Sequence, residues 1–163
     1  MPKVGNSRTR KDVRKLHGAT VDLFALMSRP QRDETLIREA GIALDRALFP
    51  LLVGIERYGP IGVVDLADRV GRDHTTVSRQ VTKLESLGLI ERKSSAADRR
   101  INEAVITPAG RTLTDALDAA RLRIAAPILA QWTDADFSNL VRLMRRFVDD
   151  LMGLPERPNE EGR

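Results

Sequence analysis

The chain has 163 residues, of which 42% are hydrophobic and 31% are charged, as is typical of a globular domain. An excess of 27 Lys and Arg over 23 Asp and Glu gives a net charge of +4, which favours an anionic partner. No apolar run reaches the roughly 18 residues of a membrane span and no secretory signal follows Met1, so we expect a cytoplasmic protein without membrane contact. The absence of Cys excludes disulfides and thiol-based sensing, and the two His are far apart, so we expect no metal and no cofactor.

Basic residues dominate the beginning of the chain. Residues 1–16 hold six Lys or Arg against one Asp, and residues 1–12 show no periodicity, which predicts a mobile basic arm. From Val13 to Met27 apolar residues recur at helical spacing, and a shorter helix is predicted over Glu34–Ala40. We interpret residues 13–44 as N-terminal dimerisation helices.

The next helix is predicted from Asp45, a suitable N-cap, to Tyr58. Pro50 lies inside this range and removes a backbone donor. The helix must therefore begin near Phe49 or bend at Pro50.

Residues 61–107 carry a compact series of predicted elements. They are a very short strand at Ile61, a helix over Val63–Val70, a helix that Asp73 caps and that runs to Leu87, and strands over Leu89–Lys93 and Asn102–Thr107. Two helices joined by a tight turn and followed by a basic β-hairpin are typical of a winged helix-turn-helix domain. We assign this domain to residues 45–107 and predict a mainly α (α+β) fold.

The helix after Asp73 has two contrasting faces. At 100° per residue, Val77, Val81 and Leu84 point inward. The opposite face carries small hydroxyl and basic residues: Thr75, Arg79, Thr82, Lys83 and Ser86. Such a face suits a DNA major groove, where Arg can bridge O6 and N7 of guanine. The alternative is a solvated polar face, which we would prefer for an isolated helix, but the turn before the helix and the hairpin after it favour DNA.

The hairpin loop, residues 94–100, places Arg99 and Arg100 next to each other. Arginine is attracted to the negative potential of a narrow minor groove, whereas Asp98 would repel phosphate unless it orients Arg100 or Arg79. The alternative is a surface hairpin with an incidental ion pair.

Several short motifs occur in the order of a known family. They are Gly59-Pro60-Ile61, Val64-Asp65-Leu66-Ala67, the run from Asp73 to Arg79, the run from Leu84 to Ile90, Asp98-Arg99-Arg100 and Thr107-Pro108-Ala109-Gly110. Together they resemble the MarR (multiple antibiotic resistance regulator) transcription factors. Two departures are Gly62, where the family often places Ser or Thr as a helix cap, and the polar Asn102 and Glu103 in the second strand of the wing.

The resemblance implies a homodimeric regulator of transcription, usually a repressor, that binds a pseudo-palindromic operator in double-stranded DNA. The candidate DNA-binding residues of the recognition helix are His74, Thr75, Thr76, Ser78, Arg79, Thr82 and Lys83, and those of the wing are Asp98, Arg99 and Arg100. The resemblance also suggests a cleft for a small-molecule effector, with Phe24, Tyr58 and Trp132 as candidate lining residues. Ordinary core roles are the alternative for these three.

Amphipathic helices also dominate residues 108–152. Thr107-Pro108 opens the first, Pro127 is expected to kink or end it, and Thr133 with Asp136 resembles a capping box before the last helix. We interpret these helices as the C-terminal part of a dimerisation domain and residues 153–163 as a polar tail. The alternative is that the terminal helices cover each other within one subunit.

No motif of an enzyme is present: the chain has no Gly-rich phosphate loop and no Gly-x-Ser-x-Gly elbow, and we predict no catalytic residue. Two alternatives to the regulator hypothesis are a winged-helix module for protein interactions and a nonspecific DNA-binding protein. The basic set Arg79, Lys83, Arg99 and Arg100 argues against the protein-interaction module, because aromatic or aliphatic anchors are more usual there.

Overall fold

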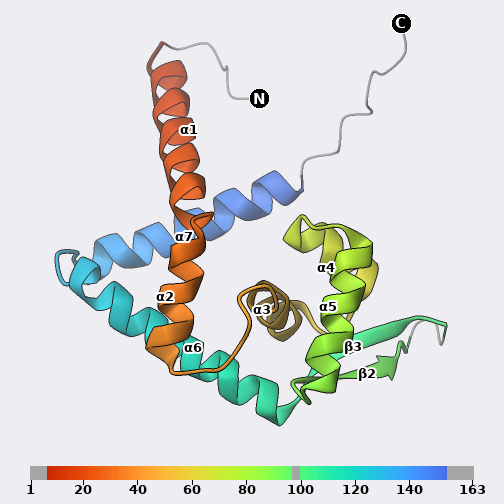
Figure 1. Ribbon diagram of the computed structural model, residues 1–163. Coiled ribbons are helices and arrows are strands. Elements are labelled where there is room, and N and C mark those ends of the chain that lie inside the picture. The colour runs from red at the N-terminus through yellow and green to blue at the C-terminus, as the bar shows by residue number, and fades with distance from the viewer. Residues whose placement is uncertain (1–6, 97–99, 154–163) are drawn as a thin grey trace, which may run out of the picture. The chain divides into compact units, whose positions relative to one another are not determined.

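The computed structural model describes residues 7–96 and 100–153. It contains the helices and the small sheet expected of a mainly α fold, in the order shown in Figure 1. The chain divides into two compact units, Met1–Arg121 and Leu122–Arg163. Within the described residues, no helix is both long and apolar enough to cross a membrane.

The first two helices are longer than the sequence predicts. Helix α1 spans Ser7–Met27, so six residues assigned to a mobile arm are helical, and residues 1–6 lie outside the described ranges. Extending a helix that is already nucleated costs little, and the Arg and Lys residues at its start favour helix. Helix α2 spans Pro30–Ala40, with Pro30 in the first turn, where its missing N–H needs no partner.

Helix α3 spans Phe49–Tyr58, which confirms the later of the two predicted starts. Pro50 lies in its first turn. Asp45 does not cap this helix: its Oδ1 accepts a hydrogen bond of 2.7 Å from the Ala47 N–H and stabilises the turn that leads into it.

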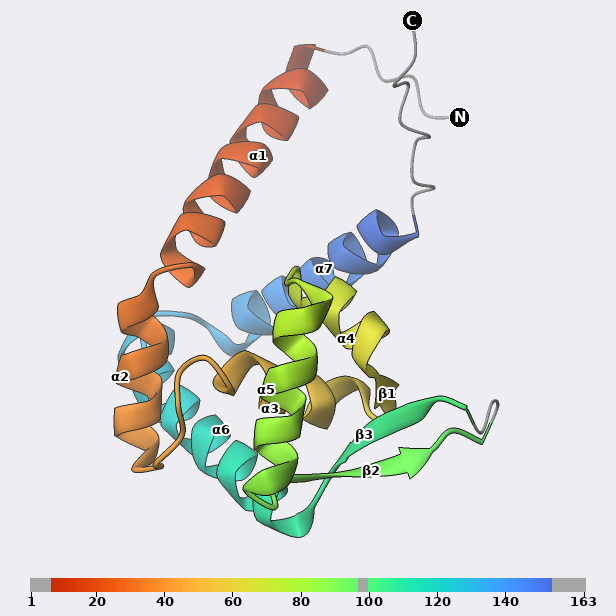
Figure 2. The ribbon, with the colours of Figure 1, turned by 45° about the vertical axis from the view of Figure 1, so that its right-hand side comes forward.

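The winged helix-turn-helix core follows. Its elements are β1 (Ile61–Gly62), α4 (Val63–Val70), α5 (His74–Ser86), β2 (Ile90–Ser94) and β3 (Asn102–Ile106). The antiparallel sheet has the order β1-β3-β2, and Figure 2 shows β2 and β3 extending away from the helices as a wing. The polar Asn102 and Glu103 do not shorten β3, since they pair with Ser94 and Lys93 of β2.

The apolar core joins the helices and the sheet of this domain. Helix α3 lies at its centre and contacts both α4 and α5. Side chains with no exposed surface come from α3, α4, α5 and α6: Leu51, Leu52, Leu66, Val77, Val81, Leu84 and Leu117. This core holds α5 by its apolar stripe and leaves the opposite face free for another role.

Helix α6 spans Pro108–Leu129 and is anchored to the core at its first turn. The Thr107 hydroxyl donates to the Gly88 carbonyl (2.7 Å) and accepts from the Gly110 N–H (3.1 Å). Pro127 does not end the helix, which continues for two residues to Leu129, and a kink at Pro127 stays a prediction.

Helix α7 spans Asp134–Met152. The predicted cap is confirmed: the Thr133 hydroxyl accepts from the Asp136 N–H at 3.1 Å and donates to the Asp136 carboxylate at 2.7 Å. No described residue of α7 is buried, although the helix is strongly amphipathic.

Candidate nucleic-acid interface

Helix α5 is held at its first turn by Asp73. The Oδ1 of Asp73 accepts a 2.9 Å hydrogen bond from the Thr76 N–H, and this bond lowers the pKa of the Asp73 carboxyl below its ordinary value. Gly71 precedes the cap with φ +63°, a conformation that closes the α4–α5 turn and that favours glycine. The turn therefore presents the positive N-terminal end of α5 at the surface.

The two faces of α5 are as the sequence predicts. Val77, Val81 and Leu84 are fully buried. The candidate DNA-binding residues His74, Thr75, Thr76, Arg79, Thr82 and Lys83 are exposed, and Ser78 is half-buried. The outer face thus combines hydroxyl groups, a guanidinium and an ammonium, with Leu87 just beyond its C-terminal end.

Thr82 has a contact that the sequence did not reveal. Its hydroxyl donates to the Ser78 carbonyl (3.0 Å) and accepts from Nη2 of Arg92 in β2 (2.8 Å). The Nε of Arg92 also lies 3.4 Å from the Glu85 carboxylate. These contacts join α5 to β2, the first strand of the wing, so Thr82 has a structural role besides the predicted contact with DNA.

The wing carries further charge. Lys93 forms an exposed ion pair of 2.7 Å with Glu91 on the same strand, and Arg100 is exposed in the turn two residues before β3. Asp98 and Arg99 lie outside the described residues, so the predicted brace from Asp98 to Arg100 or Arg79 remains a prediction.

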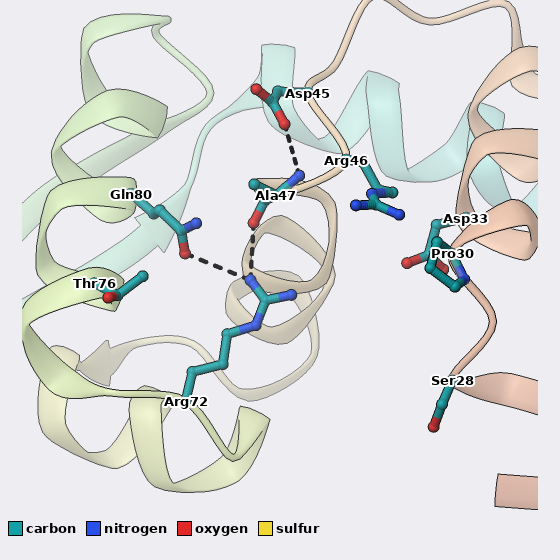
Figure 3. Close-up of a pocket in the computed structure, with 9 residues that line it drawn as sticks. All are labelled: Ser28, Pro30, Asp33, Asp45, Arg46, Ala47, Arg72, Thr76 and Gln80. Atoms are coloured by element: carbon teal, nitrogen blue, oxygen red, sulfur yellow. Dashed lines mark hydrogen bonds between the residues drawn. The ribbon is translucent and has the colours of Figure 1, made fainter. Parts of the chain in front are cut away.

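A cavity of about 420 Å³ lies between α2 and the N-terminal half of α5 (Figure 3). Its lining is mostly polar: Ser28, Pro30, Asp33, Asp45, Arg46, Ala47, Arg72, Thr76 and Gln80. Partial burial raises the pKa of Asp33, while the guanidinium groups of Arg46 and Arg72 act in the opposite direction. The cavity therefore offers both donors and acceptors to a small polar molecule.

The three residues predicted to line an effector cleft do not line this cavity. Phe24 is 73% exposed on α1 and Trp132 is 44% exposed before α7. The Tyr58 ring lies against the guanidinium groups of Arg69 and Arg57, at 4.5 Å and 5.4 Å from its centroid. Sequence reasoning missed the lining residues because short polar and charged side chains in separate segments give no recognisable pattern.

Among the residues that the structure describes, no group of three His, Asp or Glu could hold a metal ion.

Residues 44–101 match the MarR family model. The chain is also 33% identical over 110 residues to the uncharacterised HTH-type transcriptional regulator YxaD of Bacillus subtilis strain 168, a match that covers 65% of this chain and 77% of the relative. The chain belongs to the MarR family. It is thus a member of a family of DNA-binding transcriptional regulators.

Solved structures agree with the fold of this MarR family chain. A MarR family protein from Bacillus stearothermophilus aligns with a TM-score of 0.63 at 16% identity, over 90% of this chain and 98% of that one. RV1404 from Mycobacterium tuberculosis aligns with a TM-score of 0.63 at 23% identity, over 89% of this chain and 97% of that one. At these identities the likeness concerns the fold alone.

Proposed function

We propose that this MarR family protein is a cytoplasmic, homodimeric repressor that binds a pseudo-palindromic operator through α5 and the wing. The observation that carries the proposal is the outer face of α5, where exposed hydroxyl groups surround Arg79 and Lys83 on a helix whose apolar side is fully buried. Short side chains let such a helix approach the base edges closely.

Within this proposal the residues divide into two groups. Arg79 reads guanine in the major groove, while Thr75, Ser78 and Lys83 contact neighbouring bases and phosphates. Arg99 and Arg100 of the wing enter the adjacent minor groove, where their charge meets an enhanced negative potential. His74, the first residue of α5, contacts a phosphate in this proposal, because the N-terminal end of a helix favours an anion.

Dimerisation is supported by apolar side chains left exposed on the terminal helices. In α1, Phe24 is 73% exposed and Met27 is 58% exposed, and in α7, Val141 is 53% exposed. Large apolar side chains exposed on each of these amphipathic helices are typical of a surface that a partner covers. A two-fold dimer presents two recognition helices, which explains the expectation of a pseudo-palindromic site.

Release by a small molecule is the regulatory part of the proposal. The cavity of about 420 Å³ has α2 on one side and Thr76 and Gln80 of α5 on the other. In this proposal α5 has two orientations, one of which binds DNA. A ligand that binds more tightly to the other orientation lowers DNA occupancy, and the ratio of its two affinities sets the size of the effect.

The test is selection of bound duplexes from a random DNA pool by the purified full-length protein at two salt concentrations. A two-fold symmetric motif that persists at the higher salt concentration supports the proposal. Binding that yields no motif and vanishes as salt rises would point to a nonspecific DNA-binding protein. The absence of any binding would favour a winged-helix module for protein interactions.

A further inference from the structure

One arginine joins three separate segments behind the recognition helix. Arg72 lies in the turn between α4 and α5 and is half-buried. Its Nη1 donates to the Ala47 carbonyl (2.9 Å), 25 positions earlier in the chain, and to Oε1 of Gln80 in α5 (3.4 Å). Figure 3 shows both bonds meeting at the same guanidinium nitrogen.

The bond to Gln80 reaches α5 next to the predicted base-reading residue Arg79. Gln80 directly follows Arg79 and is half-buried at the edge of the apolar stripe. A shift of Gln80 relative to the turn before α3 would therefore also move the Arg79 side chain. Because the donor is charged, its 2.9 Å bond to the Ala47 carbonyl is stronger than a bond between neutral groups, and the longer 3.4 Å contact with Gln80 adds to it.

The direction of the guanidinium argues against a contact with phosphate. Arg72 reaches toward the Ala47 carbonyl and lines the cavity, together with Asp33 and Arg46. It also acts electrostatically on Asp33 of α2. Arg72 thus interacts with α2, with the turn before α3 and with α5, whereas the outer face of α5 carries Arg79 and Lys83.

We propose that Arg72 is a positioning residue that holds the N-terminal half of α5 at the angle required for sequence discrimination. The proposal rests on the DNA-binding function proposed above. In this role Arg72 contacts neither a base nor a phosphate but orients α5. Removing the Arg72 side chain should therefore reduce the preference for the operator more than the general affinity for DNA.

The experiment compares Arg72→Ala, Arg72→Lys, Gln80→Ala and the Arg72→Ala/Gln80→Ala double variant of the full chain. Fluorescence anisotropy gives the Kd for the selected operator and for a scrambled duplex over a series of salt concentrations. Arg69→Ala is the matched control, because it removes the same charge three residues earlier, where the guanidinium lies over Tyr58. Circular dichroism establishes that each variant is folded.

We expect Arg72→Ala to weaken operator binding on the order of tenfold and scrambled-duplex binding much less, with the salt dependence unchanged. Arg72→Lys should restore part of the preference, since Lys can still donate to one acceptor. Gln80→Ala should act in the same direction, and the double variant should lose less than the sum of the two single effects. Arg69→Ala should keep the wild-type ratio of the Kd for the scrambled duplex to the Kd for the operator.

A second measurement does not depend on DNA. Amide hydrogen exchange of the free protein should become faster over residues 74–80 in Arg72→Ala and in Gln80→Ala, and much less so over residues 81–86. If Arg72→Ala is unfolded, Gln80→Ala and Arg72→Lys supply the same comparison.

Three results would overturn the proposal. An equal loss on both duplexes, with a salt slope reduced by about 0.9, would make Arg72 a phosphate contact. An unchanged operator preference with unchanged exchange would remove Arg72 from the mechanism while leaving the DNA-binding proposal intact. A wild-type protein with no preference for any duplex would overturn both proposals.

Discussion

Arg79 is the residue on which sequence readout by this protein should depend most. It is exposed near the middle of α5, and the buried Val77 and Val81 on either side of it hold the helix against the core. Because a guanidinium can donate two parallel bonds to O6 and N7 of guanine, Arg79→Ala should cost about 1–3 kcal/mol of operator binding and relax the preference at one base pair. Anisotropy titrations against operators changed at each position measure both effects.

A lysine at the same position separates charge from geometry. Arg79→Lys keeps the charge but not the two-pronged donor, so the affinity should recover more than the base preference does. If Arg79→Ala weakens all duplexes equally, Arg79 contacts the backbone and not a base.

Asp73 connects the stability of the helix cap to pH. The hydrogen bond from the Thr76 N–H lowers the pKa of Asp73 below 3.8 in the folded protein. A depressed folded-state pKa means that the charged cap stabilises the protein above pH 3.8 and that this contribution is lost as the pH falls through the folded-state pKa. Asp73→Ala should therefore lower Tm at pH 7, and the difference from the wild type should shrink at acidic pH. A constant difference in thermal scans between pH 7 and pH 2.5 would contradict this account.

At the scale of the elements, the junction between the sheet and α6 depends on a glycine. Gly110 is buried in the first turn of α6, and a Cβ there would overlap the Leu89 carbonyl oxygen and lie 2.8 Å from Cγ1 of Ile106. A backbone carbonyl cannot move aside as the end of a flexible side chain can. Gly110→Ala should therefore destabilise the protein by about 1–3 kcal/mol, since overpacking exceeds the gain in helix propensity.

Gly18 provides the matched control in another helix. An added Cβ there meets nothing within 4 Å. Gly18→Ala should leave stability unchanged or raise it by about 0.5–1 kcal/mol, because alanine restricts the unfolded chain and favours helix. Urea denaturation followed at 222 nm measures both variants, and equal losses for the two would mean that steric overlap at Gly110 is not the cause.

Elements with a strong local signal were the predictable ones. The bounds Val63–Val70 were predicted without error, because glycines flank a short apolar repeat, and Asp73 was correctly identified as the cap of the next helix. The start of α1 was wrong because its first turns have no apolar periodicity. Helix α2 begins four residues earlier than predicted, since Pro30 marks a first turn as readily as a break.

Contacts between distant segments were beyond the reach of local patterns. The bond from Arg72 to the Ala47 carbonyl involves a backbone acceptor, which any residue supplies, and the bond from Arg92 to Thr82 depends on where β2 meets α5. The sequence therefore predicted which residues α5 exposes, but it did not predict which of them are held by neighbours. That distinction separates Arg79, a candidate for base reading, from Thr82, whose hydroxyl already has two partners.

For the whole molecule, the question is what covers the terminal helices. On α7, side chains on the apolar stripe remain exposed, including Leu140 at 40% and Met144 at 39%. Ion pairs such as Arg145 with Asp149 lie on the same helix away from the stripe, so α7 has one charged and one apolar side. In the proposed dimer, α7 buries its apolar side against the partner.

Charge placed on that stripe should separate the subunits. A Leu140→Glu/Met144→Glu variant would bury two carboxylates in each subunit's side of the interface, and burying an unpaired charge costs several kcal/mol. Light scattering after size exclusion should then give about the 18.2 kDa of one chain, where the wild type gives about twice that mass. Ala135→Glu is the matched control, because it adds a carboxylate to the exposed opposite side of α7 and should leave the dimer intact.

Operator binding should follow the change in mass. A monomer carries one copy of α5, so its affinity for the proposed pseudo-palindromic operator should fall to that for a single half-site, while the charge of α5 and the wing is unchanged. We expect the double variant to stay folded, because the winged core does not include α7. Circular dichroism checks that it does. A variant that stays dimeric would place the interface elsewhere, and a folded monomer with wild-type affinity would mean that one recognition helix suffices and that the operator need not be palindromic.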